Sequence, residues 1–368
     1  MYILERASSH GQRQHSHFCA MPLRISYAPF RLLFKHPFET SHGVRDGTDS
    51  IFVRIEENGV AGYGEVTLPP YLEEKPEAVL QRLRAVAVRA PVSISELLHL
   101  LDDHQLFGPG AMGCRNGLFL AALDTLGKSN NKTASQVLNN RELKSPVTLV
   151  TLGITPLEHL QDKLRELPLS GGLKLKVGHA GSKAMILAVK QLDARPIFLD
   201  ANQGLSSVEQ AMDLLESAGS RLLGMEQPFP VNDMLNQSEL QGKIKASVYG
   251  DESIQGEFEL EHSLKLFNGL NIKLIKCGGL DRAKAMAVRA GELGIKVMLG
   301  SMSESSLGCT AMAHLAGQAE IVDLDGPWLI KNDPFEGMDM RNGKLIMPDR
   351  PGIGAVIKAA LDFIPICA

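Results

Sequence analysis

The sequence lacks the features that would assign it to several specialised classes of protein. No apolar run approaches the roughly 20 residues that a membrane-spanning helix needs, so we expect no membrane partner. The formal net charge is only -4 and no basic patch stands out, which argues against a nucleic-acid partner. The hydrophobic and charged fractions, 44% and 22%, are those of an ordinary globular protein.

Cysteine is also scarce, and its placement carries no pattern. The five cysteines are odd in number and show no metal-binding spacing, which favours reduced thiols in a cytoplasmic protein. They are Cys19, Cys114, Cys277, Cys309 and Cys367. Residues 1–20 are polar, rich in His and Ser, and lack the apolar core of a signal peptide, so we interpret them as a disordered extension.

A chain of 368 residues should form two domains or one large one. Residues 21–140 place alternating strand-like segments before helical ones, which predicts an α+β domain. Asn58-Gly59 predicts a hairpin turn between two of these strands. The polar connection at residues 37–47 is long, and we interpret it as a candidate lid.

The most informative stretch is Gly-Gly-Leu-Lys-Leu-Lys-Val-Gly at residues 171–178. It reads as a short buried strand, on which Lys174 and Lys176 share one face. Two adjacent ammonium groups repel each other, so the charge of Lys174 should lower the pKa of Lys176 and suit it to act as a general base. The alternative is a basic edge strand whose amines both lie in solvent.

Further charged residues follow at regular intervals, each at the end of an apolar run. Asp200, Glu226, Asp251 and Lys273 succeed Lys176 at spacings of 22 to 26 positions. That length fits one strand, one helix and two loops, which predicts a β/α barrel over residues 141–326 with strand ends near 152, 176, 200, 226, 251, 273, 299 and 325. The proline-containing segment 327–368 should return to the first domain.

All of these charged residues would lie on one rim, at the carboxyl ends of the strands, where barrel enzymes place their chemistry. Three carboxylates flanked by lysines predict a site for a hard cation between two candidate bases. None of the histidines falls at a position that suits a base.

In this order the motifs resemble those of the enolase superfamily, within its muconate lactonizing enzyme-like subgroup, and the match covers nearly everything from Met21 onward. The Asn-Ile-Lys-Leu-x-Lys-x-Gly-Gly run at 271–279 and the pair Asp323 and Asp325 further resemble dipeptide epimerases. The resemblance implies a (β/α)8-type barrel, a modified TIM barrel, with an N-terminal α+β capping domain. It also implies one Mg²⁺ per subunit, held by Asp200, Glu226 and Asp251.

The resemblance further implies that Lys176 and Lys273 face each other across the barrel, so that one removes the α-proton and the other returns it to the opposite face. The C-terminal residue of a dipeptide would then be inverted through an enediolate, with L-Ala-D/L-Glu from peptidoglycan as the leading substrate. Asp323 and Asp325 would hold the α-ammonium group. The oligomeric state stays open, a homo-oligomer included.

Several alternatives stay open at this level. Lys276 competes with Lys273 as the base, and Asn202 and Glu252 are either metal ligands or residues behind the ligands. Asp323 and Asp325 could instead cap a loop. Arg45 is a candidate for binding a substrate carboxylate, and Ser301 and Ser303 for lining the pocket through backbone amides.

Two other functions compete with an epimerase. One is a lyase on the same scaffold, such as an o-succinylbenzoate synthase or a muconate cycloisomerase, whose substrates carry no ammonium group for Asp323 and Asp325. The other is a non-catalytic barrel that binds a sugar or peptide, which leaves the lysines facing the carboxylates unexplained.

Overall fold

The computed structural model describes residues 23–40, 43–140, 147–256 and 265–367. The expected disordered extension at 1–20, with its histidines and Cys19, lies outside the described residues. So does the expected boundary at 140/141 between the two domains. No helix in the described part of the chain combines the length and apolar character needed to cross a membrane.

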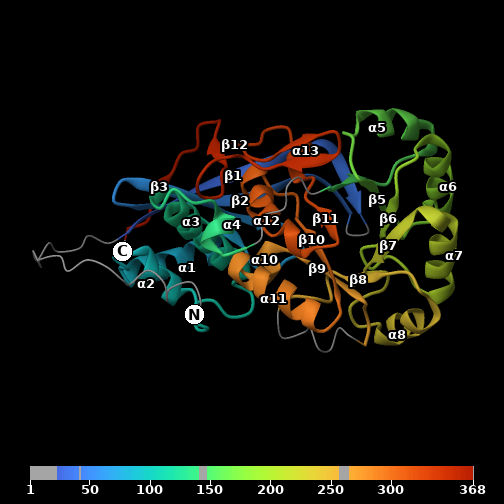
Figure 1. Cartoon of the computed structure of the whole chain (residues 1–368), viewed down its shortest axis with the longest axis horizontal. Helices are drawn as coiled ribbons and strands as arrows, with labels where there is room; N and C mark the ends of the chain where they lie inside the picture. Colours follow the sequence, from blue (N-terminus) through green and yellow to red (C-terminus); the bar gives the residue numbers. More distant parts are fainter. Residues whose placement is uncertain (1–22, 41–42, 141–146, 257–264, 368) are drawn as a thin grey trace, which may run out of the picture.

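The N-terminal region is an antiparallel sheet covered by helices, seen at the left of Figure 1. The predicted hairpin turn is present: φ is positive at Asn58 (51°) and Gly59 (82°), a conformation that asparagine and glycine adopt more easily than other residues. The strands are β1 (Arg24–Thr40), β2 (Gly43–Glu57), β3 (Val60–Leu68) and β16 (Ile364–Pro365), in the order β16-β1-β2-β3. The helices are α1 (Pro76–Val88), α2 (Ile94–Leu100), α3 (Met112–Ser129) and α4 (Ala134–Val137).

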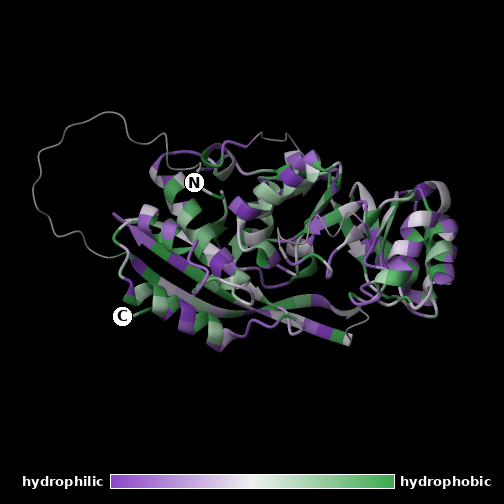
Figure 2. Cartoon of the chain, turned by 90° about the horizontal axis from the view of Figure 1, so that it is seen from below, coloured by the Kyte–Doolittle hydropathy of each residue, from purple (hydrophilic) through white to green (hydrophobic). Residues whose placement is uncertain are grey.

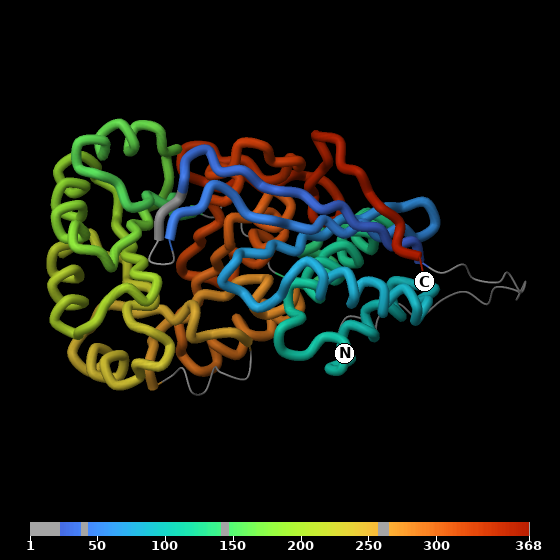
Figure 3. The backbone as a smooth tube through the Cα atoms, turned by 180° about the vertical axis from the view of Figure 1, so that it is seen from behind, coloured from blue at the N-terminus to red at the C-terminus, as the bar shows by residue number. Residues whose placement is uncertain are grey.

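Strands β1 and β2 form a longer hairpin than we expected. After an irregularity between Leu33 and Phe38, pairing resumes with Phe38 opposite Arg45 and Thr40 opposite Gly43. The expected long connection at 37–47 is therefore mostly strand, because the ladder of backbone hydrogen bonds continues through its polar residues. Figure 3 shows this blue hairpin reaching across the molecule towards the green segment of α5. In Figure 2 hydrophilic and hydrophobic stretches both occur along the long strands, and β2 is buried continuously over residues 50–53.

Within the described residues, eight parallel strands form the barrel in strict chain order, from β4 to β11. A parallel bridge between Thr148 and Val322 joins the first strand to the last and closes the sheet. The predicted barrel is thus confirmed, and every strand ends within two residues of its predicted end. The strands are β4 (Leu149–Leu152), β5 (Gly172–Lys176), β6 (Ile197–Asp200), β7 (Leu222–Glu226), β8 (Val248–Gly250), β9 (Gly269–Ile272), β10 (Lys296–Gly300) and β11 (Ile321–Asp323).

Helices cover the outside of the barrel, and short strands follow it. The helices are α5 (Leu160–Glu166), α6 (Ser182–Leu192), α7 (Val208–Ala218), α8 (Met234–Lys243), α10 (Leu274–Cys277), α11 (Leu280–Glu292), α12 (Ser306–Ala313) and α13 (Gly326–Leu329). The 3₁₀ turns in the described residues are η1 (Leu157–His159), η2 (Gly219–Arg221) and η4 (Ala316–Gln318). The last short strands are β12 (Phe335–Glu336), β13 (Asp339–Arg341), β14 (Lys344–Ile346) and β15 (Val356–Ile357).

The C-terminal segment runs back to the N-terminal sheet. Strand β16 pairs with β1, with Ser26 opposite Pro365 and Tyr27 opposite Ile364. One apolar core extends from the sheet and α3 into the β9–β11 side of the barrel, whereas the β5–β7 side has a core of its own. The barrel rim nearest the N-terminal region is therefore held rigidly against it.

Arg115 of α3 is the main polar link between the N-terminal helices and the barrel. Its side chain is 1% exposed, and its guanidinium donates to the carbonyl of Gly278 at 2.6 Å and to both carboxylate oxygens of Asp281 at 3.0 and 2.7 Å. A bidentate pair of this kind fixes both distance and orientation. It therefore sets how the N-terminal helices meet α10 and α11.

Substituting Arg115→Ala should destabilise the protein by about 3–5 kcal/mol, because it strands polar groups in a buried site. Urea unfolding would measure this loss as a lower midpoint. The exposed Arg84 offers the control, since Arg84→Ala should change the free energy of unfolding by less than about 0.5 kcal/mol. Equal effects of the two substitutions would contradict the role given to Arg115.

Candidate active site

Lys174 lies inside the barrel among acidic side chains. Its side chain is 3% exposed, and its Nζ atom lies 2.9 Å from Asp200 Oδ2, 2.7 Å from Glu226 Oε2 and 2.7 Å from Asp323 Oδ2. Burial by itself lowers the pKa of Lys174, but these three carboxylates outweigh it and raise the pKa well above its ordinary value. Lys174 is therefore charged, and the alternative of a solvent-exposed basic strand is wrong.

Lys176 ends the same strand and reaches the cavity. Its Nζ atom donates to Asp200 Oδ2 at 2.6 Å and to Asn202 Oδ1 at 2.9 Å. Its side chain is 11% exposed, so it is the more accessible of the two lysines on β5. The expected effect of the charge of Lys174 on the pKa of Lys176 stays a prediction.

Lys273 and Lys276 both bind Asp251, but in different ways. Lys273 Nζ donates to Asp251 Oδ2 at 2.7 Å, whereas Lys276 Nζ donates to Asp251 Oδ1 and to the Asp251 carbonyl, both at 2.6 Å. Lys276 also donates to the carbonyl of Asn271 at 3.1 Å. The Lys276 ammonium group is therefore held by three acceptors, two of them backbone carbonyls, whereas the hydrogen bond given for Lys273 is to a side-chain carboxylate alone.

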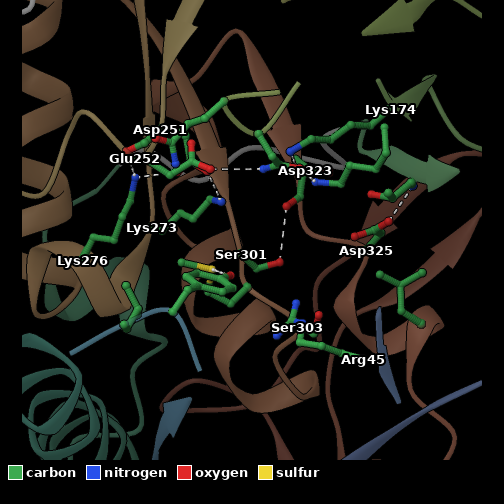
Figure 4. Close-up of a pocket in the computed structure, with 18 of the residues that line it drawn as sticks. Arg45, Lys174, Asp251, Glu252, Lys273, Lys276, Ser301, Ser303, Asp323 and Asp325 are labelled. Atoms are coloured by element: carbon green, nitrogen blue, oxygen red, sulfur yellow. Dashed lines mark hydrogen bonds and ion pairs between the residues drawn. The ribbon is translucent and has the colours of Figure 1, made fainter. Parts of the chain in front are cut away.

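Lys176 and Lys273 reach one cavity from opposite sides. Their strands, β5 and the end of β9, stand second and sixth in the closed order of the eight described barrel strands. Both side chains line a cavity of about 300 Å³, called here the active-site cavity. Figure 4 shows Lys273 and Lys276 on one side of this cavity and Lys174 on the other.

Three carboxylates end consecutive strands beneath the cavity. Asp200 is the register partner of Glu226 on the neighbouring strand, and Asp251 follows β8 directly. Burial alone would raise the pKa of all three, but Lys174 and Lys176 lower the pKa of Asp200, and Lys273 and Lys276 lower that of Asp251. Burial and the charge of Asp200 raise the pKa of Glu226.

An all-oxygen set of this kind matches the donors that Mg²⁺ prefers, and a bound cation would offset the negative charges of Asp200 and Asp251 that raise the pKa of Glu226. Among the described residues, the acidic side chains do not stand as a ready-made group of metal ligands. Each of the three carboxylates instead has a lysine ammonium within 3 Å. The residues therefore fit the ion chemically, and a bound ion would compete with these ammonium groups for the carboxylate oxygens.

Asp323 and Asp325 lie at the end of β11 on the wall of the cavity. Asp323 Oδ2 accepts from Lys174, and Asp325 Oδ2 accepts from the backbone N–H of Thr151 at 2.6 Å. Burial and the charge of Asp323 raise the pKa of Asp325 to about 6. Asp325 stands at the N-terminus of α13, yet its side chain makes no capping hydrogen bond there. Asp325 therefore does not cap α13 with its side chain.

Arg45 extends from the hairpin over the mouth of the cavity. Its guanidinium stacks on two rings, 5.7 Å from the centre of Phe34 and 5.4 Å from that of Tyr71. Its Nη1 atom is buried and has no hydrogen-bond partner among the described residues. Arg45 is thus oriented by aromatic faces and keeps a donor for an incoming acceptor.

The remaining expected residues also line the cavity. Asn202 accepts from Lys176 and donates to Glu252 Oε1 at 3.3 Å, which favours roles beside the lysine for both residues. Ser301 and Ser303 line the cavity as well, but the amide of Ser301 donates to the carbonyl of Asp323 at 3.1 Å. The expectation that Ser301 presents its amide to the cavity is therefore wrong.

Four residues near the site were not found by sequence reasoning. Tyr71 stacks on Arg45, and its hydroxyl donates to Met302 Sδ at 3.1 Å. Asn271 donates to Glu226 Oε1 at 2.7 Å, and Thr151 holds Asp325. Gln227 Oε1 accepts from the amide of Asp251 at 3.1 Å. Of these four residues, only Asn271 could have been found from the sequence. It lies two residues before Lys273, so its side chain points to the same face of the strand.

Comparison with known proteins agrees with this architecture. The model for the mandelate racemase / muconate lactonizing enzyme N-terminal domain matches residues 28–138, and the model described as enolase C-terminal domain-like matches residues 162–361. The chain is 31% identical over 339 residues to the L-Ala-D/L-Glu epimerase of Bacteroides thetaiotaomicron, covering 91% of this chain and 88% of that one.

Two solved structures extend the comparison. The substrate-liganded L-Ala-D/L-Glu epimerase of Bacillus subtilis has a TM-score of 0.84 and 25% identity, with 92% of this chain and all of that chain covered. A dipeptide epimerase of Methylococcus capsulatus, complexed with Mg and L-Arg-D-Lys, has a TM-score of 0.81 and 25% identity, with 91% and 100% covered. The chain belongs to the enolase superfamily, in its mandelate racemase / muconate lactonizing enzyme group. Like the epimerases it resembles, it is an isomerase.

Proposed function

We propose that this protein is a Mg²⁺-dependent dipeptide epimerase that inverts the α-carbon of the C-terminal residue. One observation carries the proposal: the amines of Lys176 and Lys273 enter a single cavity from opposite sides of the barrel. Inversion by proton transfer needs a base on each face of the same carbon. Lys276 is tied to two backbone carbonyls, so Lys273 is the better second base.

The reaction is a 1,1-proton transfer between the two lysines. The neutral lysine on one face takes the α-proton, and the charged lysine on the other face then donates a proton to the planar enediolate. The two lysines exchange protonation states in each turnover, so the roles reverse for the opposite epimer. Lys174, charged and held by three carboxylates, supplies positive charge beside Lys176.

Asp200, Glu226 and Asp251 would hold one Mg²⁺ per subunit, in the place where lysine ammonium groups now pair with them. The ion would neutralise charge that grows on the substrate carboxylate as the α-proton leaves. Asn202 and Glu252 would orient Lys176 through the hydrogen bonds they make. Asn271 would orient Glu226 in the same way.

The cavity carries groups that suit both ends of a dipeptide. Asp323 and Asp325 offer carboxylates to an α-ammonium group, and Arg45 offers an unused donor to an acidic C-terminal side chain. L-Ala-D/L-Glu is therefore the leading substrate, in agreement with the name of the Bacteroides relative. Substrates of the lyase alternative carry no ammonium group, which would leave Asp323 and Asp325 without a partner. Ser301 and Ser303 would contact the substrate through their side chains.

Two further assignments accompany this function. We place an N-terminal capping domain at residues 21–140, the barrel at 141–326 and a returning segment at 327–368. The free thiols of Cys114, Cys277, Cys309 and Cys367 favour a reducing compartment such as the cytoplasm, where peptidoglycan dipeptides would be met.

The function is tested by incubating the protein and Mg²⁺ with a library of L,L-dipeptides in deuterated water. Each dipeptide whose α-proton exchanges should gain one mass unit, and L-Ala-L-Glu should be one of them. Omitting Mg²⁺ and adding a chelator should stop the exchange. If no dipeptide exchanged while a succinylbenzoate precursor was converted, the lyase would replace the epimerase.

A further inference from the structure

A second cavity lies beside the active-site cavity and shares three wall residues with it. The common residues are Thr151, Ser303 and Leu329. The second cavity has a volume of about 400 Å³ and lies between the hairpin, the loop after β4 and α13. Its wall is largely apolar, with side chains that include Phe34, Leu152, Ile154, Leu167 and Trp328.

The two cavities meet at the proposed ammonium site. Thr151 lines both, and its backbone N–H binds Asp325 Oδ2 at 2.6 Å. Asp325 begins α13, the short helix that carries Trp328 and Leu329 into the wall of the second cavity. The amide of Trp328 donates to the carbonyl of Asp325 at 2.9 Å, which holds the backbone turn that joins the two residues.

The outer rim of the second cavity is polar and links the hairpin to α5. His36 Nε2 lies 3.0 Å from Glu166 Oε2, and Lys163 Nζ donates to the same oxygen at 2.9 Å. Charged groups therefore stand on the α5 side of the second cavity, and the three shared residues form its border with the active-site cavity. This arrangement suits an apolar group that arrives from the active site.

We infer that the second cavity is the subsite for the side chain of the substrate's N-terminal residue, and that it selects a large apolar side chain. The inference rests on the proposed function and refines its leading substrate, because it keeps the acidic C-terminal residue and replaces the N-terminal alanine by a larger apolar residue. The α-carbon of that residue is one bond from the ammonium group, so its side chain leaves from the point where the cavities meet. An alanine methyl group leaves most of about 400 Å³ unfilled, whereas a leucine side chain buries apolar surface against Ile154 and Trp328.

The single tryptophan of the chain, Trp328, reports on this subsite directly. Titrating the Mg²⁺-loaded protein with L-Leu-L-Glu should shift its tryptophan fluorescence, and L-Ala-L-Glu should shift it far less. In the deuterium-exchange assay, kcat/KM for L-Leu-L-Glu should exceed that for L-Ala-L-Glu by about tenfold or more.

A variant pair separates the subsite from the rest of the site. Ile154→Phe narrows the second cavity and should lower kcat/KM for L-Leu-L-Glu at least about tenfold while sparing L-Ala-L-Glu. Leu169→Phe is the matched control, because Leu169 is 69% exposed and does not line the cavity. Leu169→Phe should leave kcat/KM unchanged for both dipeptides.

The outcomes distinguish the two proposals. If L-Ala-L-Glu is turned over but L-Leu-L-Glu neither shifts the fluorescence nor reacts faster, the subsite inference is overturned and the epimerase stands. The same conclusion follows if Ile154→Phe affects both dipeptides equally. If the wild-type protein exchanges no dipeptide at all, the epimerase itself is overturned, and the subsite inference falls with it.

Discussion

Lys176→Met and Lys273→Met should each abolish epimerisation, with losses of about 10²- to 10⁴-fold or more, while preserving one-sided proton exchange. Each variant keeps one of the two proposed bases, and these bases reach the cavity from opposite sides of the barrel. Lys176→Met should therefore still exchange the α-proton of the epimer that faces Lys273, and Lys273→Met that of the other epimer. NMR of separate L,L and L,D dipeptides in deuterated water resolves the two cases.

Lys276→Met is the control for this pair. Lys276 binds the carbonyls of Asp251 and Asn271, so its loss should slow the exchange of both epimers alike rather than one of them. Retained epimerisation in Lys176→Met or Lys273→Met would show that another group provides the second base. One-sided exchange in Lys276→Met would move the catalytic role to that lysine.

The double substitution Asp323→Asn, Asp325→Asn should nearly abolish dipeptide turnover while sparing Mg²⁺ binding. Each charge-assisted hydrogen bond to an ammonium group contributes about 1.5–3 kcal/mol, so losing two predicts a decrease of roughly 10²- to 10⁴-fold in kcat/KM. Lys174 loses its bond to Asp323 but keeps Asp200 and Glu226, so the charge beside Lys176 persists. Titration calorimetry with Mg²⁺ in the absence of dipeptide measures whether the affinity for the metal is unchanged.

An N-acetylated dipeptide supplies the matched control, because it lacks the ammonium group. The wild-type protein should process it poorly, and the double variant should lose little further activity on it. Unchanged kinetics of the double variant with free dipeptides would reject the epimerase assignment. A loss of Mg²⁺ affinity equal to the loss of turnover would instead assign the aspartates to the metal site.

The repeating part of this protein was predictable from sequence because local order and chemistry coincide there. Each barrel unit is an apolar strand that ends in a charged residue, and parallel strands bring those ends to one rim. Asp200, Glu226 and Asp251 could therefore be placed together before any contact was known. The same repeat predicted that the lysines of β5 and Asp323 at the end of β11 lie on this rim.

Residues outside the repeat could not be placed in this way. Tyr71 and Arg45 line the cavity only because the N-terminal region packs on the barrel, and no spacing in the chain indicates that arrangement. The hairpin of β1 and β2 was longer than its polar residues indicated, since backbone pairing does not depend on apolar side chains. Asn271 looked like an ordinary strand residue until Glu226 was seen beside it.

The sequence by itself determined the barrel, its rim of acids and lysines, and the class of chemistry, because alternating strands and helices of fixed length leave one arrangement for those strand ends. The tertiary structure alone decided which carboxylate each lysine binds, how Lys273 differs from Lys276, and where a second apolar cavity opens beside Asp325. Those outcomes depend on distances of a few ångströms between segments far apart in the chain, which only packing sets.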